Sequence, residues 1–358
     1  MVSLIPITVV TGFLGAGKTT LLNRLLKQPE LADTAVLINE FGEVGLDHLL
    51  VETVRDDIVL LNAGCLCCTV RGDLVKALHM LFLRRVHGEV PLFARVIIET
   101  TGLADPAPIL QTLMTDAVIA ARYRLDGIVT LVDAVNGRTT LDAQPEAVKQ
   151  AAVADRIVLT KSDLTSPPRI AELWERLRRL NPGALIEPAR DGVIDPKLLL
   201  DLGPFRPDAK ISAVIGWLNA ETFAQEDHHH GHHGQHADHG LNRHSERIQT
   251  FCMTFDQPLR WNGIGTFLEM LVATHGENLL RIKGLLNLAG QDRPMVIHGV
   301  QHVFHEPMLL REWPAGDDRR SRLVFITRDL DRSVIEHGVK AFETAAGAGR
   351  TGRAAPAA

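Results

Sequence analysis

The sequence predicts an α/β fold: a doubly wound, mostly parallel sheet with a phosphate-binding loop, followed by a smaller α+β C-terminal domain. Up to about residue 205, near-continuous apolar runs rich in β-branched residues alternate with amphipathic helical patterns. Such runs are typical of strands that are covered on both faces, as in a parallel sheet. A glycine-rich loop directly follows the first of these runs, which is the position that a nucleotide-binding loop takes in this fold.

The expected strands of the first domain all follow this apolar pattern. In chain order they are residues 6–10, 35–39, 58–61, 95–99, 127–133, 156–160 and 184–188. Between them, one amphipathic helix begins at Lys18, a second contains residues 74–82, and a third spans roughly residues 168–180. Helices that alternate with parallel strands are expected to cover both faces of the sheet.

The composition changes abruptly after the first domain. Residues 228–244, HHHGHHGQHADHGLNRH, hold eight of the sixteen histidines and show no apolar period. This pattern predicts a flexible linker over residues 226–246, between a domain of residues 1–225 and one of residues 247–345. Neutral imidazoles bind Zn²⁺, Ni²⁺, Cu²⁺ or Co²⁺, so the run either collects metal ions or is merely a solvated linker.

The C-terminal domain has shorter and more regularly alternating patterns. Strands are expected at residues 247–255, 294–304 and 322–327, and helices at residues 263–275 and in the stretch that ends near residue 345. The remaining residues, 346–358, contain no side chains suited to a core and are expected to be disordered.

Composition excludes several classes of protein. A formal net charge of −5 gives no general attraction to nucleic acid or to an anionic membrane. No apolar stretch approaches the roughly 20 residues that a membrane helix needs. The apolar start lacks the basic beginning and the cleavage site of a signal peptide. Three of the four cysteines are clustered, which indicates metal or redox chemistry in a reducing compartment. We therefore expect a cytoplasmic protein, monomeric or weakly homo-oligomeric.

The strongest motif is a phosphate loop. Residues 12–19, GFLGAGKT, match the pattern Gly-x4-Gly-Lys-Ser/Thr at every fixed position. Lys18 is expected to reach the β- and γ-phosphates, and Thr19 to offer its hydroxyl to Mg²⁺. The apolar strand before the loop and the helix after it argue against an ordinary glycine-rich turn. The residues expected to contact the nucleotide here are Gly12, Gly15, Ala16, Gly17, Lys18, Thr19 and Thr20.

An acid at the end of a neighbouring strand should complete the Mg²⁺ site. Glu99 ends the run RVIIE, and Gly102 follows it, so that the Gly102 N–H could sense the γ-phosphate. The alternative for Glu99 is an ordinary surface carboxylate at the end of a strand. We expect Lys18, Thr19 and Glu99 to carry the catalytic chemistry, although the sequence does not identify a catalytic base.

The tetrapeptide TKSD, residues 160–163, indicates the base of the nucleotide. Asp163 could accept two hydrogen bonds from the N1–H and the N2 amino group of guanine, which adenine does not offer in that arrangement. Lys161 would lie across the ring, and Thr160 stands where many GTPases carry asparagine. The motif directly follows an apolar strand, so GTP is favoured over ATP.

The cysteine cluster GCLCC, residues 64–68, follows the expected strand 58–61. Ligands of an open parallel sheet gather beyond the carboxyl ends of its strands, so these thiols are expected on the nucleotide side. Thiolates of Cys65, Cys67 and Cys68 on one Zn²⁺ would leave a fourth position for water, a carboxylate, a histidine or a client protein. Buried small hydrophobic residues and a redox pair remain alternatives. Cys252 lies in an alternating pattern and is expected in the core.

Taken together, these motifs resemble the CobW-like metallochaperones, within the larger group of P-loop GTPases that includes the hydrogenase and urease nickel-insertion GTPases. The resemblance rests on GFLGAGKTT, NEFGEVGLD (39–47), GCLCC, ETTGLADP (99–106), LVDAV (131–135) and LTKSD (159–163). It extends to the histidine-rich run and to LLRIKGLLNL (279–288) and GVQHVF (299–304), and so covers nearly the whole chain.

The resemblance implies a slow GTPase that uses GTP and Mg²⁺, binds Zn²⁺ or Co²⁺ at the Cys-x-Cys-Cys motif, and delivers the metal to a client protein. It also implies that Asn39, Glu40 and Glu43 lie in a nucleotide-responsive switch, with Glu43 as the leading candidate for an extra carboxylate ligand of the metal or a carboxylate of the Mg²⁺ shell. Two alternatives are a P-loop kinase of small molecules with structural cysteines, and a metal-storage protein with vestigial nucleotide binding. The TKSD motif argues against the kinase, and the intact set of Lys18, Thr19 and Glu99 argues against the storage protein.

Overall fold

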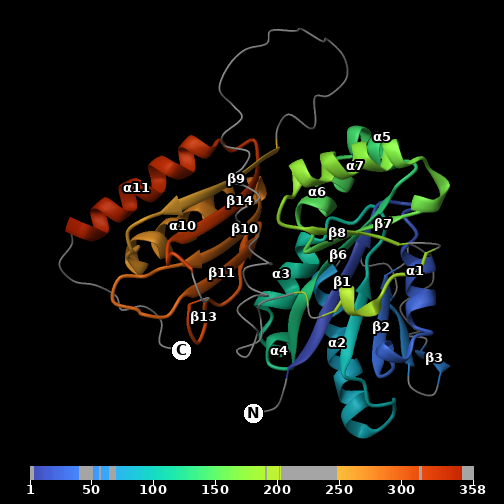
Figure 1. Ribbon diagram of the computed structural model, residues 1–358. Coiled ribbons are helices and arrows are strands. Elements are labelled where there is room, and N and C mark those ends of the chain that lie inside the picture. The colour runs from blue at the N-terminus through green and yellow to red at the C-terminus, as the bar shows by residue number, and fades with distance from the viewer. Residues whose placement is uncertain are drawn as a thin grey trace. The chain divides into compact units, whose positions relative to one another are not determined.

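The structure is a computed structural model that describes residues 4–39, 51–55, 58–63, 70–189, 192–200, 202, 248–313 and 317–348 (Figure 1). The described residues form two compact units. The first contains the residues up to Leu177 and the stretch from Ala184 to Leu202. The second contains Arg178–Gly183 and the described residues from Ile248 onward.

The first unit is built on a sheet with eight described strands, in the spatial order β3-β4-β2-β5-β1-β6-β7-β8. Their bounds are β1 Ile5–Gly12, β2 Thr34–Asn39, β3 Val51–Arg55, β4 Ile58–Ala63, β5 Arg95–Glu99, β6 Tyr123–Asp133, β7 Arg156–Thr160 and β8 Leu185–Pro188. Of the described strand pairs in this sheet, only β3–β4 is antiparallel. The carboxyl ends of all the other strands therefore lie at one edge.

The helices of this unit connect the strands. They are α1 Lys18–Leu25, α2 Val70–His87, α3 Ala107–Thr115, α4 Ala117–Ala120, α5 Gly137–Ala143, α6 Pro145–Ala152 and α7 Pro167–Leu180, with short 3₁₀ turns at Pro29–Leu31, Ser162–Leu164 and Pro196–Leu198. Leu21, Leu22 and Leu25 of α1 pack on Val10 and Val129 of the sheet. All but one residue of β1 are buried, as expected for a central strand that is covered on both faces.

The predicted fold class is confirmed, and each of the seven predicted strands of the first domain corresponds to an observed one. The sequence reading missed β3, a short antiparallel strand in which charged residues interrupt the apolar pattern. It also did not name α3 to α6, four helices of four to nine residues.

The second unit contains an antiparallel sheet. Its described strands lie in the order β12-β11-β10-β14-β9, and β13 pairs with β11. The bounds are β9 Ile248–Phe255, β10 Leu279–Leu286, β11 Met295–Val300, β12 Val303–Phe304, β13 Met308–Leu309 and β14 Ser321–Arg328. Helices α10 (Trp261–His275) and α11 (Arg332–Ala348) pack on the sheet through a core that includes Phe251, Phe267, Ile282, Phe325 and Ile335, and a 3₁₀ turn, Gly276–Asn278, follows α10.

Two features of this sheet differ from the prediction. The predicted strand 294–304 is divided into β11 and β12, because Gln301 adopts a left-handed conformation with φ of 50° and turns the chain. The central strand β10 was missed, although all of its residues are buried. Its run contains Arg281 and Lys283, which break the apolar signal but are only 1% and 2% exposed.

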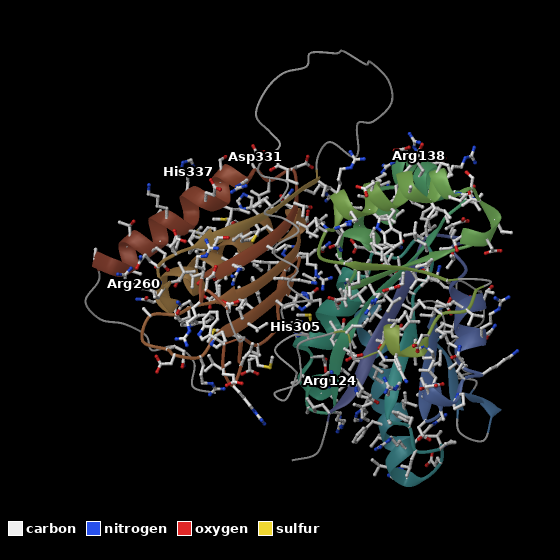
Figure 2. All side chains as sticks on the ribbon, in the orientation of Figure 1. Arg124, Arg138, Arg260, His305, Asp331 and His337 are labelled. Carbon is white, nitrogen blue, oxygen red and sulfur yellow. The ribbon has the colours of Figure 1, made fainter. Side chains whose placement is uncertain are left out.

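None of the helices in the described part of the chain combines the length and the apolar character that a membrane span requires. Figure 2 shows the side chains of both units on the ribbon of Figure 1.

Candidate nucleotide-binding site

The phosphate loop connects β1 to α1 and depends on three glycines. Gly12, Gly15 and Gly17 have φ values of 143°, 75° and 87°. Residues with a side chain rarely adopt such positive values. A Cβ atom on Gly12 would also lie 2.4 Å from the carbonyl oxygen of Leu131, so this position has no room for a side chain. Gly17 is the N-cap of α1, so the first N–H groups of the helix open onto the loop.

Lys18 places a buried cation inside this loop. Its Nζ donates hydrogen bonds to the carbonyl oxygens of Gly12, at 2.8 Å, and of Phe13, at 3.4 Å. Burial lowers the pKa of the Lys18 ammonium group, and the nearby charge of Glu99 acts in the opposite direction. A cation that is surrounded mainly by neutral carbonyl groups attracts an anion, and the helix N-terminus beside it favours the same charge.

Thr19, in the first turn of α1, meets Glu99 at the end of β5. The Thr19 hydroxyl donates to Oε1 of Glu99 at 2.9 Å, and Glu99 is only 4% exposed. The alternative of a surface carboxylate is therefore excluded. A hydroxyl and a carboxylate are hard oxygen donors, which Mg²⁺ prefers, so this pair fits the metal that a phosphate loop requires.

Gly102 brings the loop after β5 against the phosphate loop. A Cβ atom on Gly102 would lie 2.7 Å from the Leu14 nitrogen and 2.8 Å from the Leu14 Cα atom. Thr100 anchors the loop after β5. Its backbone N–H donates to the carbonyl oxygen of Val10 at 2.9 Å, and its hydroxyl donates to the Thr11 hydroxyl at 2.8 Å. Because the two loops touch through main-chain atoms, a displacement of one is transmitted directly to the other.

Helix α6 holds this loop from its other side. Gln150 is 0% exposed, and its Nε2 donates to the carbonyl oxygens of Gly102 at 3.2 Å and Ala104 at 2.9 Å. One residue earlier, Lys149 forms an ion pair with Asp105 at 2.9 Å. The sequence analysis missed both residues. The only available signal was a polar pair at the end of a short apolar helix, which is also common at a protein surface.

Thr160 and Lys161 connect β7 to the phosphate loop. The buried Thr160 hydroxyl donates to the carbonyl oxygen of Ala16 at 2.7 Å, and Lys161 Nζ donates to that of Gly15 at 2.8 Å. Thr160 thus makes the link to the loop through its hydroxyl group. Asp163 is exposed in the 3₁₀ turn that follows, so its carboxylate is accessible to solvent.

Asp133 is a further member of the site that the sequence analysis did not single out. It lies at the end of β6 and pairs with Lys161 at 2.7 Å. Burial alone would raise the pKa of the Asp133 carboxyl, but hydrogen bonds from Lys161, from the Asn136 side chain and from the N–H groups of Val135 and Asn136 outweigh it. The net effect is a pKa below the usual aspartate value, so Asp133 stays charged and fixes Lys161.

A cavity of about 130 Å³ lies beside the phosphate loop. It is lined by residues of the loop, the end of β6 and the first turns of α5, and it reaches Gln150 and Lys161. The cavity therefore contacts the Gln150 side chain, Gly15 of the phosphate loop and both partners of the ion pair between Lys161 and Asp133.

The predicted metal ligands Cys65, Cys67, Cys68 and Glu43 lie outside the described residues, as do Glu40 and the histidine-rich run. Among the residues that are described, no group of three or more His, Cys, Asp and Glu side chains could hold a metal ion. Cys252 is half-buried rather than fully buried, and packs against the smaller apolar cluster of the second unit.

A glycine-lined loop between a strand and a helix, with a buried lysine and a threonine–glutamate pair, defines a P-loop nucleotide-binding protein. The family model "CobW/HypB/UreG, nucleotide-binding domain" matches residues 6–188, and "Cobalamin synthesis protein cobW C-terminal domain" matches residues 248–343. The chain therefore belongs to the CobW/HypB/UreG family of P-loop GTPases and carries the CobW C-terminal domain.

Relatives of this family are similar over nearly their whole length. The zinc chaperone YjiA of Escherichia coli is 33% identical, with 92% of this chain and 96% of the relative covered. The zinc-regulated GTPase metalloprotein activator 1 of Schizosaccharomyces pombe is 31% identical, with 92% and 83% covered. The crystal structure of Zn(II)-bound YjiA GTPase from E. coli has a TM-score of 0.70 at 29% identity and covers 95% of this chain and 99% of that one.

Proposed function

We propose that the protein is a GTP-dependent metallochaperone that binds Zn²⁺, or Co²⁺, through Cys65, Cys67 and Cys68 and delivers it to a client protein. The relatives named as zinc chaperones support the metal and the role. We further propose a GTPase domain of residues 1–225, a linker of residues 226–246 and a C-terminal domain of residues 247–345. Clustered thiols remain reduced in the cytoplasm, which we propose as the compartment.

The observation that carries this proposal is the direction of β4. This strand runs parallel to β2, which runs parallel to β5, and β5 in turn runs parallel to β1. β4 therefore ends at the same edge of the sheet as β1 and β5, and the cysteine segment follows β4 in the sequence. Ligands of open parallel sheets collect at this edge, which supports a metal site close to the nucleotide.

In this proposal, the chain's own residues position the triphosphate and the base. Lys18 neutralises charge on the β- and γ-phosphates, and Thr19 and Glu99 would hold Mg²⁺, which supplies further neutralisation of the phosphate charge. The Gly102 N–H meets the γ-phosphate. Lys161 covers the face of the guanine, and Asp163 accepts hydrogen bonds from its edge. Residues 39–47, with Glu43 as a candidate metal ligand, would respond to the γ-phosphate.

Coupling of the two sites follows from this arrangement. If the γ-phosphate favours the metal-binding arrangement of the thiols, hydrolysis releases the metal to the client. Coupling free energies of this kind are typically about 1–3 kcal/mol and must be reciprocal, so the metal should tighten GTP binding by the same factor.

The test is the Zn²⁺ affinity of the full chain, measured by competition with a chromogenic chelator in the presence of a non-hydrolysable GTP analogue, GDP or no nucleotide. The wild type is compared with a variant in which Cys65, Cys67 and Cys68 are all replaced by serine, and with a deletion of residues 228–244. We expect the highest Zn²⁺ affinity in the presence of the GTP analogue. The Zn²⁺ site should be lost in the serine variant and retained in the variant that lacks residues 228–244. Equal affinities in all three nucleotide states would refute the coupling.

A further inference from the structure

The loop that follows β5 has little apolar burial of its own to fix its position. Leu103 is 49% exposed, and its neighbours Ala104 and Asp105 are half-buried. A cavity of about 130 Å³ also adjoins Leu14, the residue against which Gly102 packs. Segments with few buried apolar contacts open easily, so polar contacts must hold the main chain of this loop in place.

Two adjacent side chains of α6 supply such contacts. Gln150 donates from Nε2 to the carbonyl oxygens of Gly102 and Ala104, and Nζ of Lys149 lies 2.9 Å from Oδ2 of Asp105. The side chains of Lys149 and Asp105 are only 24% and 30% exposed. The attraction between two charges that are partly removed from water is stronger than that between fully exposed charges. The loop is therefore bound to α6 by an ion pair as well as by hydrogen bonds.

Helix α6 is a firm support for these bonds. The Thr130 hydroxyl of β6 donates to the main-chain carbonyl oxygen of Gln150 at 2.7 Å. On the same helix, Val148 and Ala151 are 5% and 0% exposed. A helix that is packed and hydrogen-bonded in this way can hold a loop whose own side chains are loosely packed.

Asp105 connects the loop to a second helix. Its Oδ1 accepts a hydrogen bond from the N–H of Ala107, the first residue of α3, at 3.0 Å, while Oδ2 faces Lys149. An N–H group at the beginning of a helix has no partner within the helix, so a carboxylate there also stabilises the helix end. The Asp105 carboxylate thus fixes the end of the loop from two directions.

We propose that Lys149 and Asp105 are positioning residues for GTP hydrolysis, and that their ion pair holds the Gly102 N–H in the position where it meets the γ-phosphate. A donor that is already in place costs no reorganisation at the moment of reaction. GDP has no γ-phosphate, so its binding does not depend on the pair. In placing the γ-phosphate at Gly102, the proposal rests on the function proposed above.

The experiment measures phosphate release by the full chain with Mg²⁺ and GTP, together with its affinity for a fluorescent GDP analogue. Lys149→Met keeps an unbranched side chain and removes the charge. An ion pair of this kind is worth up to about 1 kcal/mol, which corresponds to about fivefold in rate. We therefore expect kcat to fall by about two- to fivefold at unchanged GDP affinity, and Lys149→Arg to restore most of the lost rate. An unchanged kcat, an equal loss of GDP affinity, or no recovery with arginine would overturn the proposal.

A double-mutant cycle shows whether the two residues act as a pair. Asp105→Asn keeps an oxygen that can accept from the N–H of Ala107 and removes the charge that faces Lys149. Its effect on kcat should equal that of Lys149→Met, and the double variant should lose no more rate than either single variant. Rate losses that multiply in the double variant would refute the pairing.

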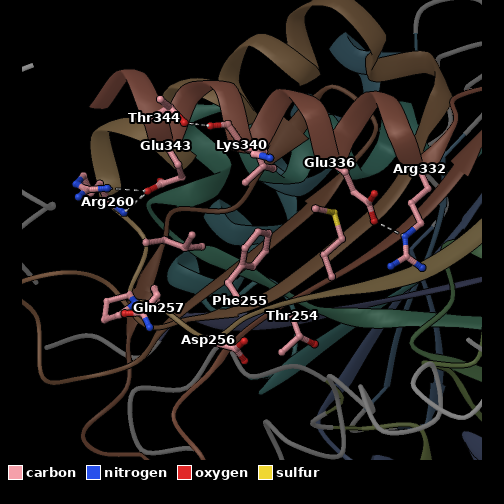
Figure 3. Close-up of a pocket in the computed structure, with 14 residues that line it drawn as sticks. Thr254, Phe255, Asp256, Gln257, Arg260, Arg332, Glu336, Lys340, Glu343 and Thr344 are labelled. Atoms are coloured by element: carbon pink, nitrogen blue, oxygen red, sulfur yellow. Dashed lines mark hydrogen bonds and ion pairs between the residues drawn. The ribbon is translucent and has the colours of Figure 1, made fainter. Parts of the chain in front are cut away.

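Two matched controls show whether the loss of any ion pair has this effect. Lys76→Met makes the same substitution at an exposed lysine of α2 that pairs with Asp73. Glu336→Gln neutralises an acid of the second unit, where Glu336 pairs with Arg332 (Figure 3). Both controls should leave kcat unchanged. A fall in kcat equal to that of Lys149→Met would overturn the proposal.

The Zn²⁺ affinity of the wild type separates this proposal from the proposed function. If that affinity is equal in all nucleotide states while Lys149→Met lowers kcat as expected, the positioning role stands and the coupling of metal to nucleotide is refuted. If the coupling is present and Lys149→Met retains full kcat, the positioning role alone is refuted.

Discussion

Replacing Gly102 with alanine tests whether the two loops of the nucleotide site act as one unit. The added methyl carbon would lie 2.7 Å from the Leu14 nitrogen and 2.8 Å from the Leu14 Cα atom, whereas ordinary contacts begin at 3.4 Å. The main chains must therefore separate by 0.6 to 0.7 Å, because 3.4 minus 2.8 is 0.6 and 3.4 minus 2.7 is 0.7. The φ of Gly102 is outside the left-handed range, so the substitution tests contact and not backbone strain.

The expected effect is large because the displaced loop binds the triphosphate. A misplacement of about 1 Å in a catalytic arrangement can cost about a hundredfold in rate, so we expect kcat/KM for GTP to fall by about tenfold or more. Overpacking of this kind also destabilises a protein by about 1–3 kcal/mol. Phosphate release measures the first effect, and urea unfolding measures the second.

Gly72→Ala is the matched control. Gly72 is exposed in α2, and a Cβ atom there meets nothing within 4 Å. Alanine should leave hydrolysis unchanged and raise the free energy of unfolding by up to about 1 kcal/mol, because glycine is unfavourable within a helix. If Gly102→Ala retains full hydrolysis and full stability, as is expected of the control, the two loops are not in the contact that the structure shows.

Three further predictions concern the side chains that hold these loops. Thr160→Val removes the hydrogen bond to Ala16 and should cost about 1–2 kcal/mol in stability and weaken guanine-nucleotide binding in calorimetry; unchanged values would exclude a role for the hydroxyl. Gln150→Leu should lower the rate of hydrolysis more than nucleotide affinity, because it releases the loop after β5 and not the phosphate loop; an equal loss of both would contradict this. Asp133 has a lowered pKa in the folded state, so its stabilising contribution is complete above the usual aspartate value of about 3.9 and is lost as the pH falls through the folded pKa. Asp133→Asn should therefore be less stable at neutral pH and lose less stability in acid, as measured by urea unfolding across pH; an unchanged acid dependence would refute the pairing with Lys161.

The sequence predicted those parts of the site that depend on local pattern. The run from β1 through the phosphate loop to Lys18 is continuous in the chain, and its glycines and apolar strand are readable without a structure. Glu99 was also predicted, because a strand ends at it. Roles of these residues in binding remain predictions, as do those of the cysteines.

The parts that the sequence did not predict depend on distant contacts. Gln150 binds carbonyl groups 46 and 48 positions earlier in the chain, and no pattern around it indicates those partners. Asp133 acts through Lys161, which lies 28 positions later. In the second unit, Arg281 and Lys283 conceal a central strand, because burial of two basic side chains contradicts the usual apolar signal.

The position of β1 in the middle of the sheet has a consequence for biosynthesis. Its neighbours are β5 and β6, so the strand that begins at Ile5 pairs with segments that are translated about 90 and 120 residues later. A nascent chain on the ribosome cannot form all the hydrogen bonds that hold the phosphate loop until Lys161 has emerged. Such distant pairing slows folding, and a nucleotide that binds only the finished sheet would then stabilise the native state by mass action.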